Sequence, residues 1–153
     1  MAIDFNYEVD FRLNDEKKFS DWISRIFKKE NSSFETLAYI FCDDEYLADI
    51  NYQYLNHNTF TDIITFDYSK EGMISGDIFI SVDRVRENAN SYEVLFENEL
   101  QRVMSHGVLH LLGYKDKTEA DRIIMRKKED EMMTLFHVEQ SNSPLEGGKG
   151  GVK

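Results

Sequence analysis

The stretch from Ser105 to Asp116, SHGVLHLLGYKD, places the strictest demands on how this chain folds. His106 and His110 lie four residues apart, so both side chains fall on the same face of a helix. Gly113 favours a left-handed C-cap, which ends the helix and turns the chain back toward the imidazoles. Asp116 follows three residues later. The spacing H-x-x-x-H-x-x-G-x-x-D therefore predicts a three-ligand metal site with an open fourth position.

Hydrophobic periodicity predicts strands and helices on both sides of this motif. The expected strands cover residues 3–11, 36–42, 62–68 and 77–82, the last two paired as a hairpin. Five helices are expected. The first is capped by Asn14, and the second, after Asp43 or Asp44, makes the first β-α-β crossover. A short third helix is capped by Ser81 or Asp83, a longer fourth is opened by Ser91, and the fifth covers residues 118–136. The pattern predicts an α/β (α+β) domain, with a mixed sheet of about four strands, about five helices and a zincin-like metal helix.

Whole-chain features limit the class of protein further. A length of 153 residues suits a single domain, which we place at residues 1–138, followed by a flexible tail at 139–153 that holds the only proline. Cys42 is the only cysteine and lies in an apolar run, which predicts a core residue and excludes an internal disulfide. The lack of a signal-like or membrane-spanning apolar segment predicts a cytoplasmic protein without a membrane partner.

The charge distribution bears on nucleic-acid binding. A net charge of -11 argues against a general nucleic-acid coat protein, because neutralising phosphates takes clustered Lys and Arg. Residues 101–153 nevertheless hold nine basic and eight acidic side chains, so the part of the chain with the motif is close to neutral. Any contact with a nucleic acid is therefore expected to be local.

The ligand types indicate which metal the motif would hold. A histidine pair at this spacing is, by itself, more often structural than metal-binding, but the following glycine and Asp116 favour a metal site. Two imidazole nitrogens and one carboxylate suit one zinc ion per chain, although ligand type leaves manganese, nickel and iron open. Zinc activates water or polarises a substrate oxygen, so hydrolysis is the expected use.

The same spacing resembles the extended zinc motif of metzincin peptidases, H-E-x-x-H-x-x-G-x-x-H or D. Those enzymes carry a glutamate general base directly after the first histidine. This chain has Gly107 at that position. A metzincin-type peptidase needs this general base, so we do not expect the chain to hydrolyse peptides. The motif predicts only the metal-binding part of the metzincin site.

Three segments together resemble the YbeY family of bacterial endoribonucleases and rRNA maturation factors. HGVLHLLGYKD is similar to the family signature H-G-x-L-H-L-x-G-Y-D-H. TDIITF at residues 61–66 is similar to T-D-V-L-S-F, and SGDIFIS is similar to G-D-I-x-I-S. The order of the segments and the chain length agree as well, and the likeness extends over residues 35–136.

The resemblance implies a single-strand-specific, zinc-dependent endoribonuclease, which is a hydrolase. Its implied roles are rRNA processing, especially maturation of the 3′ end of 16S rRNA, and ribosome quality control. The implied partners are single-stranded RNA and the small ribosomal subunit with its proteins, with no DNA partner. His106 and His110 take the places of catalytic metal ligands, and Asp116 stands where the family has a third histidine.

The chain departs from the family at further positions. Lys115 stands where the family has an aspartate, and it either contacts phosphate or is solvated. Leu55 falls where the family has an arginine implicated in RNA chemistry, and a neutral side chain cannot clamp phosphate. His57 is the nearest residue able to replace that arginine, although a loop histidine is more often simply solvated.

Other polar residues receive supporting roles. Asp62 and Asp77 are expected to cap or orient the cleft, and Glu99 to hydrogen-bond a histidine from behind. The candidate RNA contacts are Lys115, Lys117, Arg122, Arg126, Lys127 and Lys128. The alternative is that these six charges form a solvated helix face.

Two other functions remain open at this point. A zinc hydrolase of another substrate would turn over a small ester or peptide and would not cleave RNA. A non-enzymatic metal-binding ribosome-assembly factor would keep its role when the open coordination position is blocked. The neutral Leu55 makes this second alternative more credible.

Overall fold

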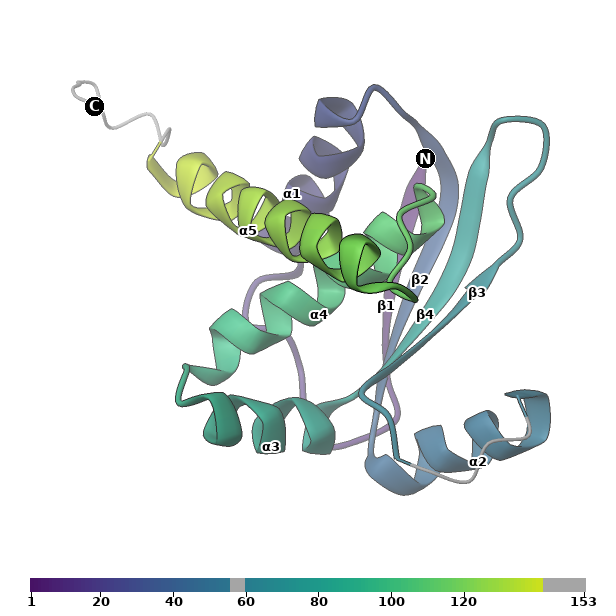
Figure 1. Cartoon of the computed structure of the whole chain (residues 1–153), viewed down its shortest axis with the longest axis vertical. Helices are drawn as coiled ribbons and strands as arrows, with labels where there is room; N and C mark the ends of the chain where they lie inside the picture. The colour runs from purple at the N-terminus through teal and green to yellow at the C-terminus, as the bar shows by residue number, and fades with distance from the viewer. Residues whose placement is uncertain (56–59, 142–153) are drawn as a thin grey trace.

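Four strands and five helices make up the described part of the chain, residues 1–55 and 60–141, in this computed structural model (Figure 1). In chain order they are β1 (Ala2–Tyr7), α1 (Glu16–Lys29), β2 (Phe34–Cys42), α2 (Asp44–Leu55), β3 (Ile63–Asp67), β4 (Ile74–Ser81), α3 (Val82–Tyr92), α4 (Phe96–Leu111) and α5 (Glu119–Ser141). The predicted α/β class and element numbers are confirmed. The expected tail at residues 139–153 lies mostly outside the described residues, and α5 runs past the predicted boundary at residue 138.

The strands form one mixed sheet in the order β1-β2-β4-β3. β1 and β2 are parallel neighbours, β2 and β4 are parallel, and β3 pairs with β4 as the predicted antiparallel hairpin. The first crossover was expected in the helix after residue 43, but α1 supplies it, because β1 and β2 lie side by side. α2 instead leads to β3, which pairs with β4 and not with β2.

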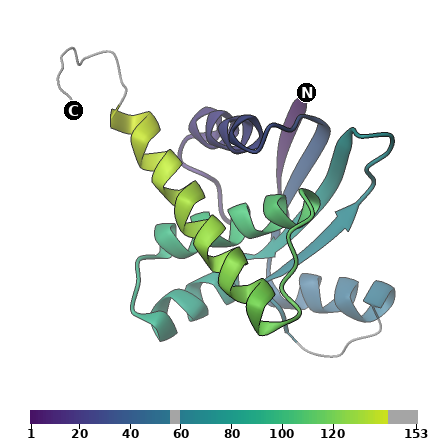
Figure 2. The same cartoon turned by 45° about the horizontal axis from the view of Figure 1, so that its top comes forward.

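α1 and α5 pack against each other beside the sheet (Figures 1 and 2). Fully buried Trp22 donates a hydrogen bond from Nε1 to the carbonyl of Met132 at 2.7 Å, and its ring contacts Phe136 edge-on. Asp15, not the expected Asn14, caps α1, because its side chain accepts a hydrogen bond from the Lys18 amide at 3.2 Å. The amphipathic pattern thus located the helix but missed its cap by one residue.

The short helix expected after Ser81 and the longer helix expected from Ser91 are both present, as α3 and α4, but the second begins later than predicted. α3 is capped by Ser81, as predicted, and ends at Tyr92, after which Glu93 takes a left-handed conformation with φ 59°. α4 then starts at Phe96, preceded by Leu95, whose side chain makes no capping hydrogen bond. Neither a glycine nor a capping side chain marks the start of α4, so the predicted boundary at Ser91 falls several residues before it.

α4 lies between the sheet and α5, and glycine allows it to approach the sheet (Figure 2). A Cβ atom at Gly107 would lie 2.9 Å from Ile78 Cγ2 and 3.1 Å from Ile63 Cδ1. Position 107 therefore faces the core, while the histidines on either side of it face outward. Packing against the sheet fixes the rotation of α4 about its axis and so the direction of both imidazoles.

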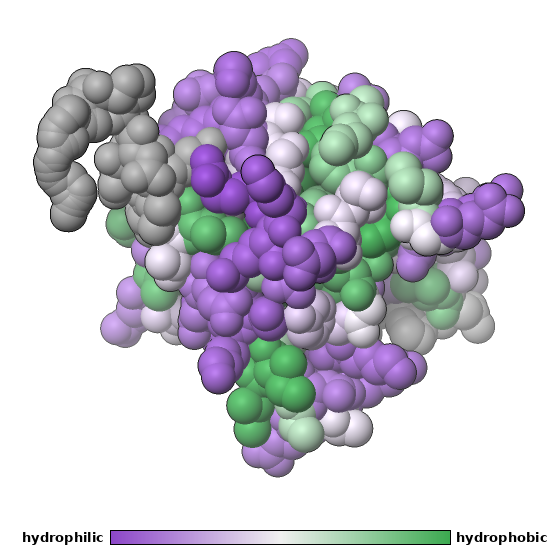
Figure 3. All heavy atoms as spheres, turned by 90° about the horizontal axis from the view of Figure 1, so that it is seen from above, coloured by the Kyte–Doolittle hydropathy of each residue, from purple (hydrophilic) through white to green (hydrophobic). Residues whose placement is uncertain are grey.

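Cys42 lies in the core, and polar residues cover much of the face shown in Figure 3. Cys42 is buried, and burial together with nearby carboxylates raises the pKa of its thiol to about 12, consistent with a core residue. Seen from above, the surface is largely hydrophilic with apolar patches between the polar residues (Figure 3). Among the described residues, every helix is too short or too polar to span a bilayer.

Candidate metal centre

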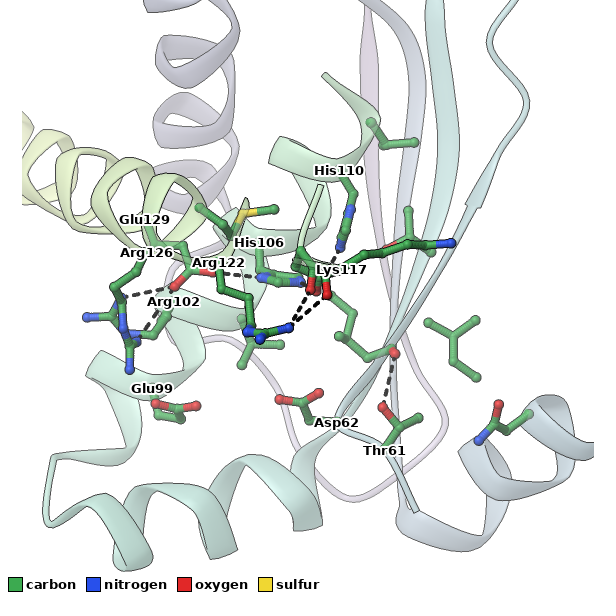
Figure 4. A pocket seen from close by; sticks show the side chains of 18 of the residues that line it. Thr61, Asp62, Glu99, Arg102, His106, His110, Lys117, Arg122, Arg126 and Glu129 are labelled. Atoms are coloured by element: carbon green, nitrogen blue, oxygen red, sulfur yellow. Dashed lines mark hydrogen bonds and ion pairs between the residues drawn. The ribbon is translucent and has the colours of Figure 1, made fainter. Parts of the chain in front are cut away.

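The three predicted ligands meet near the end of α4. Figure 4 shows two of them, His106 and His110, on the wall of the pocket. Asp116 Oδ2 lies 3.2 Å from His106 Nε2 and 3.4 Å from His110 Nε2. The helix ends as expected, because Gly113 has φ 105° and the Tyr114 amide donates a hydrogen bond back to the Leu109 carbonyl at 3.0 Å. One ligand atom from each of the three residues lies within 4.8 Å of the others, so this cluster can hold a metal ion.

The opposite nitrogen of each imidazole is engaged by the protein. His106 Nδ1 lies 2.6 Å from Glu129 Oε2, and His110 Nδ1 lies 3.0 Å from the Tyr114 carbonyl oxygen. Both partners are acceptors when Glu129 is ionised, so each Nδ1 carries the proton and each Nε2 presents a lone pair toward Asp116. This tautomer is the one that metal-ligating histidines commonly adopt.

Glu129 is the functional residue that sequence reasoning missed. The residue is only 6% exposed, and its side chain also accepts a hydrogen bond from Arg102 Nη1 at 3.0 Å. Burial alone would lower the pKa of His106, but the Glu129 carboxylate and the charge of Asp116 outweigh burial and raise it. One signal was available, because Glu129 falls in the apolar stripe of α5 with Met125, Met132 and Phe136.

We expect Glu129→Gln to lower zinc affinity about 10–100-fold, because the amide replaces the charged acceptor that orients His106. Asp130→Asn is the matched control, since Asp130 also pairs with Arg102, at 2.8 Å from Nη2, but is exposed and is not a hydrogen-bond partner of His106. Competition with a chromophoric zinc chelator measures both variants. Equal affinities for Glu129→Gln and the wild type would exclude this role.

A cleft of about 1260 Å³ opens beside the cluster. Predicted site residues that line it are Asp62, Glu99, His106, His110, Asp116, Lys117, Arg122 and Arg126. Among the described residues, Asp77, Lys115, Lys127 and Lys128 do not line it. Leu55 does, and it brings no charge there. His57 lies outside the described residues.

Lys128 has a structural setting. Its Nζ lies 2.9 Å from Glu30 Oε2 and stacks over the Tyr114 ring, so it ties α5 to the end of α1 and to the loop after α4. The hydrogen bond to Glu30 raises the pKa of Lys128. Lys115 and Lys127 are exposed to solvent. The basic residues near the metal cluster are instead Lys117, Arg122 and Arg126.

Glu99 does not play the expected supporting role. Glu129 takes the position behind His106, and among the described residues no hydrogen-bond donor reaches the Glu99 side chain, which is 5% exposed. Asp62 also faces the cleft, and Asn88 Nδ2 lies 3.4 Å from its Oδ2. Burial raises the pKa of both carboxyl groups.

The fold and the site together define a small α/β protein with a candidate His-His-Asp metal centre on a buried helix. Residues 4–137 match the family described as Endoribonuclease YbeY. The chain belongs to this family, which confirms the resemblance found in the sequence.

Relatives of the same description support the assignment. An Endoribonuclease YbeY from Flavobacterium psychrophilum is 57% identical over 91% of this chain and 99% of its own length. Another, from Bacteroides thetaiotaomicron, is 39% identical over 88% of this chain and 99% of its own length. The solution structure of a Thermotoga maritima protein superposes on this chain with a TM-score of 0.64 at 24% sequence identity. The match covers 99% of this chain and 100% of the Thermotoga chain, so the two proteins share the fold.

Proposed function

We propose that the protein is a zinc-dependent endoribonuclease that cleaves single-stranded RNA. Membership of the YbeY family supports endoribonuclease activity. The observation that supports metal dependence is the convergence of His106, His110 and Asp116 on the wall of a cleft of about 1260 Å³. The two alternatives, a hydrolase of another substrate and a non-catalytic assembly factor, find no such support in the family.

The donor set fits zinc. Both Nε2 atoms face one carboxylate, and both Nδ1 atoms are held by acceptors, so the ligands need little rearrangement to bind an ion. Zinc bound there would polarise a phosphodiester oxygen and favour ionisation of water. Asp116 brings a negative charge that a third histidine would not. It makes the site less electrophilic than one built from three neutral imidazoles.

RNA contacts in this acidic protein are assigned to the rim of the cleft. Arg122 is oriented there by the Lys117 carbonyl, which accepts its hydrogen bond at 3.0 Å (Figure 4). Arg126 is 58% exposed and lies 3.7 Å from Glu129. Since Leu55 is neutral, these two guanidinium groups and Lys117 are the cations best placed to bind phosphates in this cleft.

Replacing Arg122 or Arg126 with Gln is expected to weaken binding of a labelled single-stranded oligonucleotide. Each change should also reduce the salt slope of the affinity by about one counterion. Lys127→Gln removes the same charge from an exposed position of α5 outside the cleft and should leave both quantities nearly unchanged. Anisotropy titrations at several salt concentrations test this. Equal losses for all three variants would mean that general charge, not the cleft, binds RNA.

The cellular substrate is proposed from the family likeness. The proposed substrate is rRNA, and maturation of the 16S 3′ end is the main step. The proposed partners are the small ribosomal subunit and its proteins. The net charge of -11 supports dependence on such partners, because it disfavours unassisted binding to RNA.

The direct test is a cleavage assay with purified protein on a single-stranded RNA, its duplex, a small ester and a peptide. We expect cleavage of the single strand alone, loss of cleavage after chelation, and recovery when zinc is added back. Turnover of ester or peptide without RNA cleavage would favour the alternative hydrolase. Zinc-dependent folding without turnover of any substrate would favour the assembly factor.

A further inference from the structure

We propose that Asp62, which lines the cleft together with Glu99, is the proton acceptor for the water that attacks the phosphodiester there. This inference rests on the proposed endoribonuclease function and adds to it a catalytic residue that is not a metal ligand. It supplies the base that the motif itself lacks at Gly107.

The base cannot be placed at position 107. Gly107 is buried against β3 and β4, where even a Cβ atom would lie 2.9 Å from Ile78. A carboxylate attached there would point into the core between α4 and the sheet, away from the cleft that the imidazoles line. A proton acceptor for chemistry in this cleft must therefore come from another element.

Asp62 and Glu99 are carboxyl groups in the cleft whose negative charge is balanced by few hydrogen-bond donors and cations. Figure 4 shows both side chains reaching into it, Asp62 from the residue just before β3 and Glu99 from α4, two turns before His106. Glu129 has Arg102 and His106 as partners, and Asp116 faces both imidazoles. Glu99, by contrast, has no hydrogen-bond donor among the described residues.

Glu99 is thus a carboxyl group in a largely buried residue without a donor from the protein, a setting that often has a functional reason. Arg102 and Arg126 offset only part of the effect of burial on Glu99, because Arg102 is hydrogen-bonded to Glu129 and Asp130 and Arg126 lies 3.7 Å from Glu129. Burial, followed by the charge of Asp62, raises the pKa of Glu99, and burial raises that of Asp62. Raised pKa values bring carboxylates closer to neutral pH, where a general base is most effective.

In the proposed step, a water molecule in the cleft attacks the phosphorus of the phosphodiester. As the water oxygen bonds to phosphorus, its proton passes to a carboxylate oxygen of Asp62. The bond from phosphorus to the leaving ribose oxygen breaks, and that oxygen takes a proton from solvent. Asp62 then releases its proton to solvent, which returns the carboxylate to its starting state, and the net reaction adds one water across the phosphodiester.

The test compares Asp62→Asn, Glu99→Gln and the control Asp67→Asn, which removes a charge from an exposed position in the same cleft. We expect Asp62→Asn to lose at least about 100-fold in kcat, with unchanged zinc content and an unchanged or lower KM for a single-stranded oligonucleotide. The low-pH limb of its kcat/KM profile should disappear. Glu99→Gln should keep that limb but shift it to lower pH, because a neutral neighbour no longer opposes ionisation of Asp62.

The outcomes separate this proposal from the function on which it rests. If the wild type cleaves RNA and Asp62→Asn retains its kcat and its low-pH limb, Asp62 is not the base and the endoribonuclease function stands. Loss of zinc from Asp62→Asn would make it a metal-site residue and would also overturn the proposal. A zinc-loaded wild type that cleaves no RNA would remove the proposed function, and the inference with it.

Discussion

Asp116→Ala is expected to lose its bound metal and to lose RNA cleavage by about 1000-fold, because metal catalysis contributes several kcal/mol to such a reaction. Asp116 Oδ2 is the atom that faces both His106 Nε2 and His110 Nε2. Without it, two imidazoles remain, and two ligands from one helix turn hold zinc poorly. Elemental analysis of the purified variant, alongside single-turnover cleavage, measures both effects.

Asp116→His is the matched comparison, since the family signature carries histidine at this position. We expect it to retain metal and most of the activity, because imidazole is also a good zinc ligand. A fold check by circular dichroism separates ligand loss from unfolding. Full metal content in Asp116→Ala would exclude Asp116 as a ligand and leave the histidine pair to be explained in another way.

The second large effect is expected at Gly107. Gly107→Glu, which restores the peptidase-type motif, should destabilise the protein by about 4–5 kcal/mol or more, because it buries an unpaired carboxylate in a packed core. Gly107→Ala should cost about 1–3 kcal/mol, since the Ile78 side chain must move to admit a methyl group. Urea unfolding measures both variants.

Comparing Gly107→Ala with Gly107→Glu tests whether position 107 is enclosed by the core. If Gly107→Glu folds with the stability of the wild type, position 107 has access to solvent and the orientation of α4 described above is wrong. Peptidase activity in that variant would contradict the inference that no base fits there. We expect neither result, because Ile63 and Ile78 close the space around the glycine.

Local features of the candidate site were predictable from the sequence. The two histidines, Gly113 and Asp116 lie within eleven residues, so helix geometry and one left-handed glycine suffice to bring them together. The predicted capping box is present in both directions. Asp121 accepts from the Thr118 amide at 3.2 Å, and Thr118 Oγ1 accepts from the Asp121 amide at 3.0 Å.

Features that depend on packing between distant segments were not predictable in this way. Glu129 reaches His106 only because α5 crosses α4, and nothing in the spacing of 23 residues signals that contact. The boundary between α3 and α4 was expected at Ser91 but lies after Tyr92, because Glu93 takes a left-handed conformation that is rare for this residue type. The membership of Asp62 and Glu99 in one cleft likewise depends on β3 lying beside α4.

The hydrogen bond from Trp22 to Met132 gives the protein a built-in optical probe. Trp22 is the only tryptophan in the chain, and its indole bonds directly to α5, the helix that carries Glu129. Movement of α5 away from α1 would expose the indole to water and shift its emission to longer wavelength. Because Glu129 of the same helix hydrogen-bonds His106, the fluorescence of the unlabelled protein should report whether this side of the candidate metal site is intact, through a residue outside the cleft.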